Sequence, residues 1–198
     1  MKKIFLFFFV CLTVSPATDA QSIIHTKEWK KLAASLKNQD WKVATELSLT
    51  MLNKAISNNP DADDAARLRY LCIYSEAGLM TYSELPKSQE LKKVIGFTGQ
   101  RVILPPRPIS LTRNYNSIRL VHGKTDSLSA TVVNKNSTAI FSFEYFLFDT
   151  PWPADDFKKR AGKLCTVEGT IRSISVEGTD IFPSFRIILD HCVAKLEK

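Results

Sequence analysis

The pattern of apolar and polar positions divides the chain into a helical first half and a β-rich second half. From Thr26 to about Met80, apolar residues recur every three or four positions, the period of an amphipathic helix. Polar breaks at 38–40 and 58–60 separate three segments, and aspartates at 61, 63 and 64 suit the first turn of the third. We expect three antiparallel helices joined by short loops.

After Pro86, short runs rich in Val, Ile, Phe and Thr are bounded by turn residues, which is typical of strands. The prolines at 105, 106 and 108 argue against a central strand at that point. Residues 87–93 form a charged connection or a short helix. We expect strands at 117–121, 127–133, 139–148, 164–176 and 185–196, with a short helix at 153–162. The segment that starts at 101–104 and runs through the prolines is an edge, a bend or a polyproline stretch.

One turn of the helical half carries a resemblance to a known family. Residues 36–44 (LKNQDWKVA) resemble the inter-helix turn of a tetratricopeptide repeat, with matches at Asp40, Trp41 and Ala44. Only one repeat is visible, whereas such repeats stack to bury a core. The resemblance implies a helical hairpin used for protein contacts, and a three-helix cap on the second domain is the alternative.

The order of the second half, three strands, one helix and two strands, resembles the five-stranded oligonucleotide/oligosaccharide-binding (OB) barrel. Residues 162–171 (GKLCTVEGTI) are similar to a Gly-Lys-x-Val-x-Val-x-Gly-x-Ile strand of bacterial OB proteins, with Cys165 replacing a valine. The resemblance implies an α+β chain with an antiparallel helical module at 22–85 and an OB-like barrel with one short helix at 95–198. Another small β-sandwich or α+β sheet is the alternative.

The N-terminus has the layout of a secretory signal peptide. Two lysines precede the apolar run 4–14, and small residues follow up to Ala20. A membrane anchor would need about 20 apolar residues. We therefore expect cleavage of residues 1–20, no remaining transmembrane segment, and a periplasmic or secreted protein of bacterial type.

The chain is basic, with 27 Lys and Arg against 20 Asp and Glu and a formal charge of +7. Loss of the predicted leader removes two lysines and one aspartate, so +7 becomes +6. This charge favours an anionic partner, although it also serves solubility alone. Because we expect export, the predicted partner is a protein or an anionic polymer of the cell envelope, with nucleic acid as the alternative. The contact candidates are Trp29, Trp41, Arg119, Lys124 and Arg172.

The aromatic run within 139–148 has two interpretations. Alternation places Phe141, Phe143 and Tyr145 on one face of a strand and Phe146 and Phe148 on the other. Aromatic side chains on an exposed face stack on bases or other rings. Large aromatic residues on a central strand usually belong to the core, and this is the preferred interpretation.

Three cysteines follow the predicted leader. Cys165 and Cys192 flank Gly178-Thr179 symmetrically, so a hairpin centred there would make them direct neighbours and allow a disulfide. Free thiols are the equal alternative. Cys72 lies in a helical pattern, and we expect it to be a buried thiol.

Motifs for catalysis and metal binding are missing from the sequence. It contains no Gly-x-Ser-x-Gly and no Gly-x-Gly-x-x-Gly, and residues 123–125 lack the first glycine of a phosphate loop. No His/Cys pair has zinc-site spacing. We therefore expect no cofactor, no metal and no catalytic residue.

The sequence predicts a non-catalytic binding or adaptor protein, with a helical module for protein contacts and a β domain for an acidic or protein ligand. The alternatives are a nucleic-acid-binding OB protein and, ranked below it, a hydrolase with a Cys or Ser nucleophile.

Overall fold

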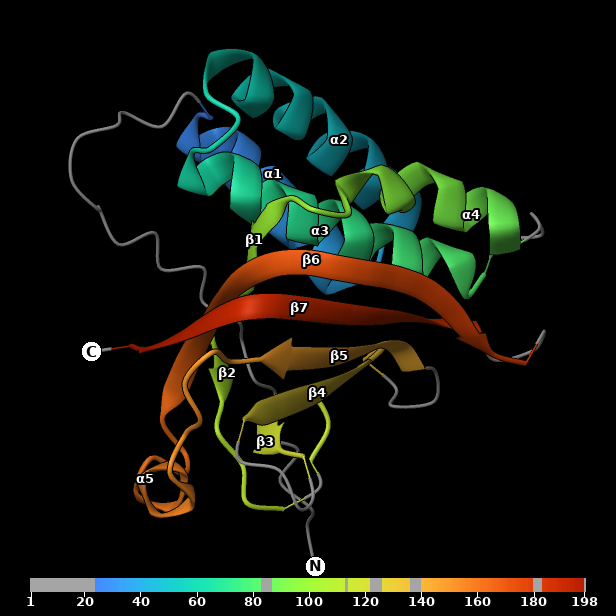
Figure 1. Cartoon of the computed structure of the whole chain (residues 1–198). Helices are drawn as coiled ribbons and strands as arrows, with labels where there is room; N and C mark the ends of the chain where they lie inside the picture. Colours follow the sequence, from blue (N-terminus) through green and yellow to red (C-terminus); the bar gives the residue numbers. More distant parts are fainter. Residues whose placement is uncertain are drawn as a thin grey trace, which may run out of the picture.

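The computed structural model describes residues 24–82, 87–112, 114–121, 126–135, 140–179 and 183–197, and all of their side chains except those of residues 140 and 141. The predicted signal peptide and Lys124 therefore lie outside the described residues. Helices α1–α4 lie together above strand β6 in Figure 1, and α5 lies apart from them at the lower end of the sheet. The chain is of the α+β class, as the sequence predicts.

The first three helices are α1 (Thr26–Asn38), α2 (Trp41–Asn58) and α3 (Asp63–Met80), which confirms the predicted helical half. At the start of α1, the backbone N–H of His25 donates to the Glu28 carboxylate over 2.9 Å, half of a capping box. Gln39 ends α1 in the left-handed conformation, with φ of 63°. The chain reverses there, so α1 and α2 form a helical hairpin.

Three shorter helices follow. The charged segment expected to be either a connection or a short helix is a helix, α4 (Lys87–Val94). A 3-10 turn, η1 (Ile95–Phe97), continues it. Helix α5 (Ala154–Lys159) confirms the predicted short helix. It carries aspartates in its first turn and lysines in its last, as the helix dipole favours.

The strands form one mixed sheet. They are β1 (Arg101–Ile103), β2 (Arg107–Pro108), β3 (Ile118–Leu120), β4 (Ser127–Val133), β5 (Ile140–Leu147), β6 (Leu164–Gly178) and β7 (Pro183–Leu196). Their order is β1-β6-β7-β5-β4-β3, and β2 also pairs with β6. Strands β5 and β7 pair in parallel, and the other pairs are antiparallel.

The predicted five-stranded barrel is wrong in its strand number and closure. The sheet has seven strands and is not closed into a barrel. The physical reason lies at Pro105 and Pro106, between β1 and β2, because proline has no N–H to donate to a neighbouring strand. The segment that the sequence predicts as an edge, a bend or a polyproline stretch is therefore divided into the short strands β1 and β2.

Helices and sheet share one continuous hydrophobic core. Helix α3 lies at its centre, and most of its residues are buried. Trp41 of α2 is 5 % exposed and packs directly on Gly78 of α3, where a side chain would overlap the indole ring. On the sheet, every residue of β4 is buried.

The β6–β7 hairpin is confirmed, but the predicted cysteine register is wrong. Gly178 pairs with Pro183, and Cys165 lies opposite Leu196 rather than Cys192. The strand register shifts where Gly169 meets the 191–192 region, and a Cβ added at Gly169 would lie 2.8 Å from Cys192 Sγ. The three described cysteines are buried free thiols, which corrects the predicted Cys165–Cys192 disulfide and confirms the burial of Cys72.

Candidate functional site

A row of polar and aromatic side chains crosses the face of the sheet that points away from α3. The register places Arg119 of β3 opposite Ser129 of β4, and Ser129 opposite Tyr145 of β5. Residues directly opposite each other in a sheet lie on the same face. The Arg119 Nε–H donates to Ser129 Oγ over 3.3 Å, so the guanidinium is held over the sheet. We call the face that carries Arg119, Ser129, Tyr145 and Arg186 the outer face.

A second guanidinium covers the aromatic ring of this row. Arg186 of β7 has its Cζ 4.9 Å from the centre of the Tyr145 ring, which is cation–π geometry. Glu177 of β6 orients it from the other side through an Nη1–Oε1 contact of 2.6 Å. The hydrogen bond and charge of Glu177 raise the pKa of Arg186. Tyr145 is half-buried, so part of its ring remains accessible between two arginines.

The opposite face of the same strands belongs to the core. Leu128, Phe146 and Ile187 are at most 3 % exposed, and Glu144 points toward α3. The aromatic run therefore divides between two environments. The core interpretation is confirmed for Phe146, whereas Tyr145 lies half-buried on the outer face. The side chain of Phe141 lies outside the described residues.

Of the basic contact candidates, the structure brings Arg119 into the row and places Arg172 near it. Tyr145 pairs with Ile188 of β7, and Ile188 pairs with Ser173 of β6, next to Arg172. The Arg172 side chain is 59 % exposed, and its Nη1 lies 3.6 Å from Asp190 Oδ1. Arg186 and Tyr145 were not among the predicted contacts. Their alternation with core residues was visible in the sequence, but their proximity depends on the parallel β5–β7 pairing.

The tryptophan candidates lie in the helical packing. Trp41 contacts Gly78 and meets the Tyr74 ring edge-on, with centroids 5.8 Å apart. Trp41 is buried because its bulk fills the space above a glycine, and its role as a ligand contact stays a prediction. Trp29 is half-buried and also packs against the core.

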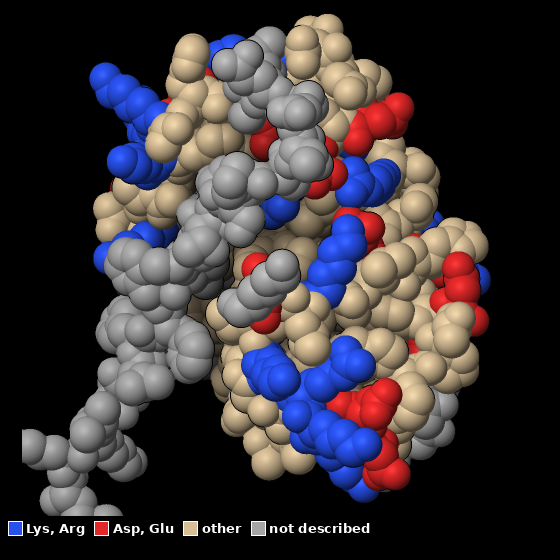
Figure 2. All heavy atoms as spheres, turned by 90° about the vertical axis from the view of Figure 1, so that its left-hand side faces the viewer, with Lys and Arg blue, Asp and Glu red and all other residues tan. Residues whose placement is uncertain are grey.

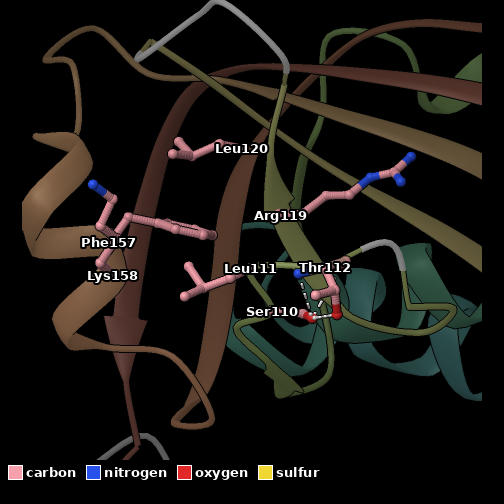
Figure 3. Close-up of a pocket in the computed structure, with 7 residues that line it drawn as sticks. All are labelled: Ser110, Leu111, Thr112, Arg119, Leu120, Phe157 and Lys158. Carbon is pink, nitrogen blue, oxygen red and sulfur yellow. Dashed lines mark hydrogen bonds between the residues drawn. The ribbon is translucent and has the colours of Figure 1, made fainter.

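A depression of about 350 Å³ lies beside β3, between α5 and the segment 110–112. Figure 3 shows Leu111, Leu120 and Phe157 converging from three elements, with Ser110 and Thr112 near one edge and Lys158 on α5. Arg119 points away from this apolar group, as expected for the residue before Leu120 on a strand. Leu111 is 59 % exposed, whereas Phe157 is 1 % exposed and forms the deepest part of the lining.

Basic side chains gather at the same end of the molecule. Figure 2 shows a group of Lys and Arg with neighbouring acidic residues at the lower end of this view, where α5 lies. Lys158 and Lys159 are 67 % and 76 % exposed and make only long contacts, 3.5 and 3.7 Å, with Asp155 and Asp156. Arg160 stacks over the Trp152 ring at 5.0 Å. Such exposed pairs are weak, so the cations remain free to meet an anionic partner.

A buried polar cluster joins α3 to the sheet. Arg107 of β2 donates to both carboxylate oxygens of Glu144 and to the Tyr70 hydroxyl. Burial opposes the charge of Arg107, but Glu144 raises its pKa overall, and burial raises the pKa of Tyr70. Because each group has its partners within the protein, the cluster is structural. The sequence signal that we missed was a lone carboxylate inside an otherwise apolar strand.

The described residues contain no group of three or more His, Cys, Asp or Glu side chains placed to hold a metal ion. Among the described helices, none combines the length and apolar character needed to cross a membrane. His191 is 72 % exposed and contacts Asp149 at 3.0 Å, which raises its pKa. Its strand neighbour Cys192 is buried, so the thiol does not join this pair.

Comparisons with known proteins give no relative: no family model matches the chain, and no curated protein or solved structure matches it significantly.

Proposed function

We propose that the protein is an exported, non-catalytic binding or adaptor protein whose outer face holds an extended acidic ligand. The observation that carries the proposal is the row in which Arg119 and Arg186 flank the half-buried Tyr145. Guanidinium groups donate two parallel hydrogen bonds to a carboxylate, which makes arginine the best side chain for binding such groups. The expected location is the periplasm or the extracellular space, after loss of residues 1–20.

The electrostatics of the row support an anionic ligand. Arg119 donates to the neutral Ser129 hydroxyl, and this hydrogen bond does not compensate the charge of the guanidinium. Without residues 1–20 the chain has a charge of +6, which attracts anions over long range. An acidic protein segment or an anionic polymer of the cell envelope satisfies both features.

The helical module at 22–85 is proposed to make protein contacts. The α1–α2 hairpin supports this proposal, because Trp41 and Ala44 are buried just after Asp40. The exposed apolar residues of α2, Val43 and Leu49, lie outside the core and suit a contact surface. The β domain at 95–198 would hold the acidic ligand.

The alternative function is nucleic-acid binding by an OB-derived sheet. Three features support an OB origin: β3, β4 and β5 are consecutive antiparallel strands, α5 precedes β6, and β7 returns to pair in parallel with β5. OB folds bind single strands on the face of their second and third strands, and Tyr145 lies on the corresponding strand here. We rank this second because export separates the protein from most nucleic acid.

The hydrolase alternative has the weakest support. Burial raises the pKa of Cys165 to about 11 and that of Cys192 to about 12, so neither thiol supplies a thiolate at neutral pH. Ser127 is buried, and its hydroxyl bonds to Asp126 over 2.9 Å.

The test is a titration of the purified protein with a fluorescent acidic peptide and with a single-stranded oligonucleotide, at low and near-physiological salt. We expect peptide binding to weaken at least about tenfold in Arg119→Gln/Arg186→Gln, because each charge-assisted bond contributes about 1.5–3 kcal/mol. The matched control is Lys27→Gln/Lys30→Gln, which removes the same charge from exposed positions on α1. Oligonucleotide binding at physiological salt without peptide binding favours the alternative, and binding of neither probe refutes the proposal.

A further inference from the structure

The depression beside β3 lies next to the outer face but has different chemistry. Arg119 and Leu120 are consecutive residues of β3, so their side chains point to opposite sides of the strand, as Figure 3 shows. A ligand that crosses the edge of the sheet at β3 would therefore meet a guanidinium on one side and an apolar depression on the other.

The size and lining of the depression suit one large apolar side chain. Its volume of about 350 Å³ lies at the lower end of the range for ligand cavities, about 300–1,000 Å³. Leu111, Leu120 and Phe157 provide an apolar lining, and the Ser110 and Thr112 hydroxyls and Lys158 provide polar groups around it. Binding energy in protein interfaces concentrates at apolar anchors that enter such pockets within a polar rim.

We propose that the ligand of the outer face is an acidic polypeptide segment that inserts one leucine- or phenylalanine-sized side chain into the depression between α5 and β3. This inference rests on the proposed function and names the class of its ligand. The charge is complementary, since Lys158 lines the depression, Lys159 is exposed close by on α5, and the Arg119 guanidinium lies on the adjoining outer face. Nucleobases and sugar rings carry polar groups around their edges, so neither offers a wholly apolar group of this size.

The test uses two synthetic peptides of glutamate and glycine, identical except that one has a phenylalanine where the other has a serine. We expect the phenylalanine peptide to bind the full protein about tenfold more tightly, the effect of burying one large apolar side chain. Leu111→Ser abolishes this difference, and Leu111 is exposed enough for the variant to fold. Ile95→Ser is the matched control, because Ile95 is 43 % exposed in η1 and does not line the depression.

A third peptide with benzoylphenylalanine at the same position locates the anchor by photo-crosslinking. We expect crosslinks at residues 110–112, 120 or 157–158. Equal affinity of the first two peptides, or crosslinks elsewhere, overturns the anchor and leaves the proposed acidic ligand of the outer face intact. If neither peptide binds, the proposed function fails and the anchor fails with it.

Discussion

The hydroxyl of Tyr70 donates a hydrogen bond of 2.8 Å to Oε1 of Glu144, although 74 positions separate the two residues in the chain. Tyr70 belongs to α3 and Glu144 to the core-facing side of β5. Arg107 of β2 completes the cluster, with Nη2 3.2 Å from the same Glu144 oxygen. The contact fixes the central helix to the sheet, and therefore fixes β5, on whose other face Tyr145 lies.

Removal of one partner from this cluster should be costly. Arg107→Met leaves the Glu144 carboxylate buried without its cation, which typically costs about 3–5 kcal/mol of unfolding free energy. Arg107→Met/Glu144→Met should regain much of this loss, since an apolar pair needs no charge compensation. Urea unfolding measures the unfolding free energies of the wild type, of Arg107→Met and of Arg107→Met/Glu144→Met.

The control for the cluster is Arg172→Met, which breaks the exposed contact with Asp190. Exposed pairs contribute about 0–1 kcal/mol, so its unfolding free energy should stay near that of the wild type. A loss of equal size in Arg107→Met and Arg172→Met would refute the structural role of the buried cluster.

The contact between Gly78 and Trp41 predicts a steric effect. A methyl group at Gly78 would overlap the indole ring, so Gly78→Ala should lower the unfolding free energy by about 1–3 kcal/mol. Gly96→Ala is the control, because a Cβ at Gly96 has no neighbour within 4 Å. Thermal unfolding followed by circular dichroism compares the two, and a Gly78→Ala protein as stable as Gly96→Ala would show that this packing is wrong.

A buried carboxylate between α3 and α4 predicts pH-dependent stability. Burial, together with a hydrogen bond to Glu90, raises the pKa of Glu76 to about 7, although Lys93 opposes the shift from 2.6 Å away. Between pH 4.5 and about 7, the folded protein therefore holds a proton that the unfolded chain releases. The contribution of Glu76 to stability is full below pH 4.5 and is lost as pH rises to about 7.

Glu76→Gln isolates this effect, because glutamine keeps a donor for Glu90 but does not titrate. We expect the unfolding free energy of the wild type to fall between pH 5 and pH 8 relative to that of Glu76→Gln. Exposed Glu46→Gln should follow the wild type. If urea titrations show that the unfolding free energies of the wild type and of Glu76→Gln change with pH in parallel, the pKa of Glu76 is not raised.

The buried thiols predict slow alkylation. Burial raises the pKa of Cys72 and of Cys192 to about 12, so iodoacetamide should label neither in the native protein and both in denaturant. Mass spectrometry of protein recovered from an oxidising compartment should find all thiols reduced. A Cys165–Cys192 disulfide in that sample would contradict the strand register.

Periodicity predicted most of the elements, because most helices and strands have a local signature, whereas the two-residue strand β2 has none. Helices α1–α3 follow the three-to-four spacing of their apolar residues, and β4–β7 follow runs of branched and aromatic residues between turns. The boundaries agree closely even for α5, whose aspartates and lysines mark its two ends.

The pairing of strands that lie far apart in the chain could not be predicted from the local pattern of residues. The expected cysteine alignment assumed an uninterrupted hairpin, but register shifts near Gly169 and Ile171 move the pairing. Arg107 lies between prolines that suggested only a bend, so its contact with Glu144 had no signal nearby. Of the contact candidates, Arg119 lies on the outer face and Arg172 lies near it, and their role in binding stays a prediction. The proximity of Tyr145 and Arg186 had no local signal, because they meet only through the parallel β5–β7 pair.

The central claim is that the outer face of the sheet binds the ligand. The most direct measurement is a nitrogen-15 NMR titration of the protein with the acidic phenylalanine peptide. We predict shifts concentrated at the amides of residues 119, 129, 145 and 186, extending to 111 and 120, and little change in α1 and α2. Shifts concentrated on the helices, with the outer face unchanged at saturation, would contradict the account.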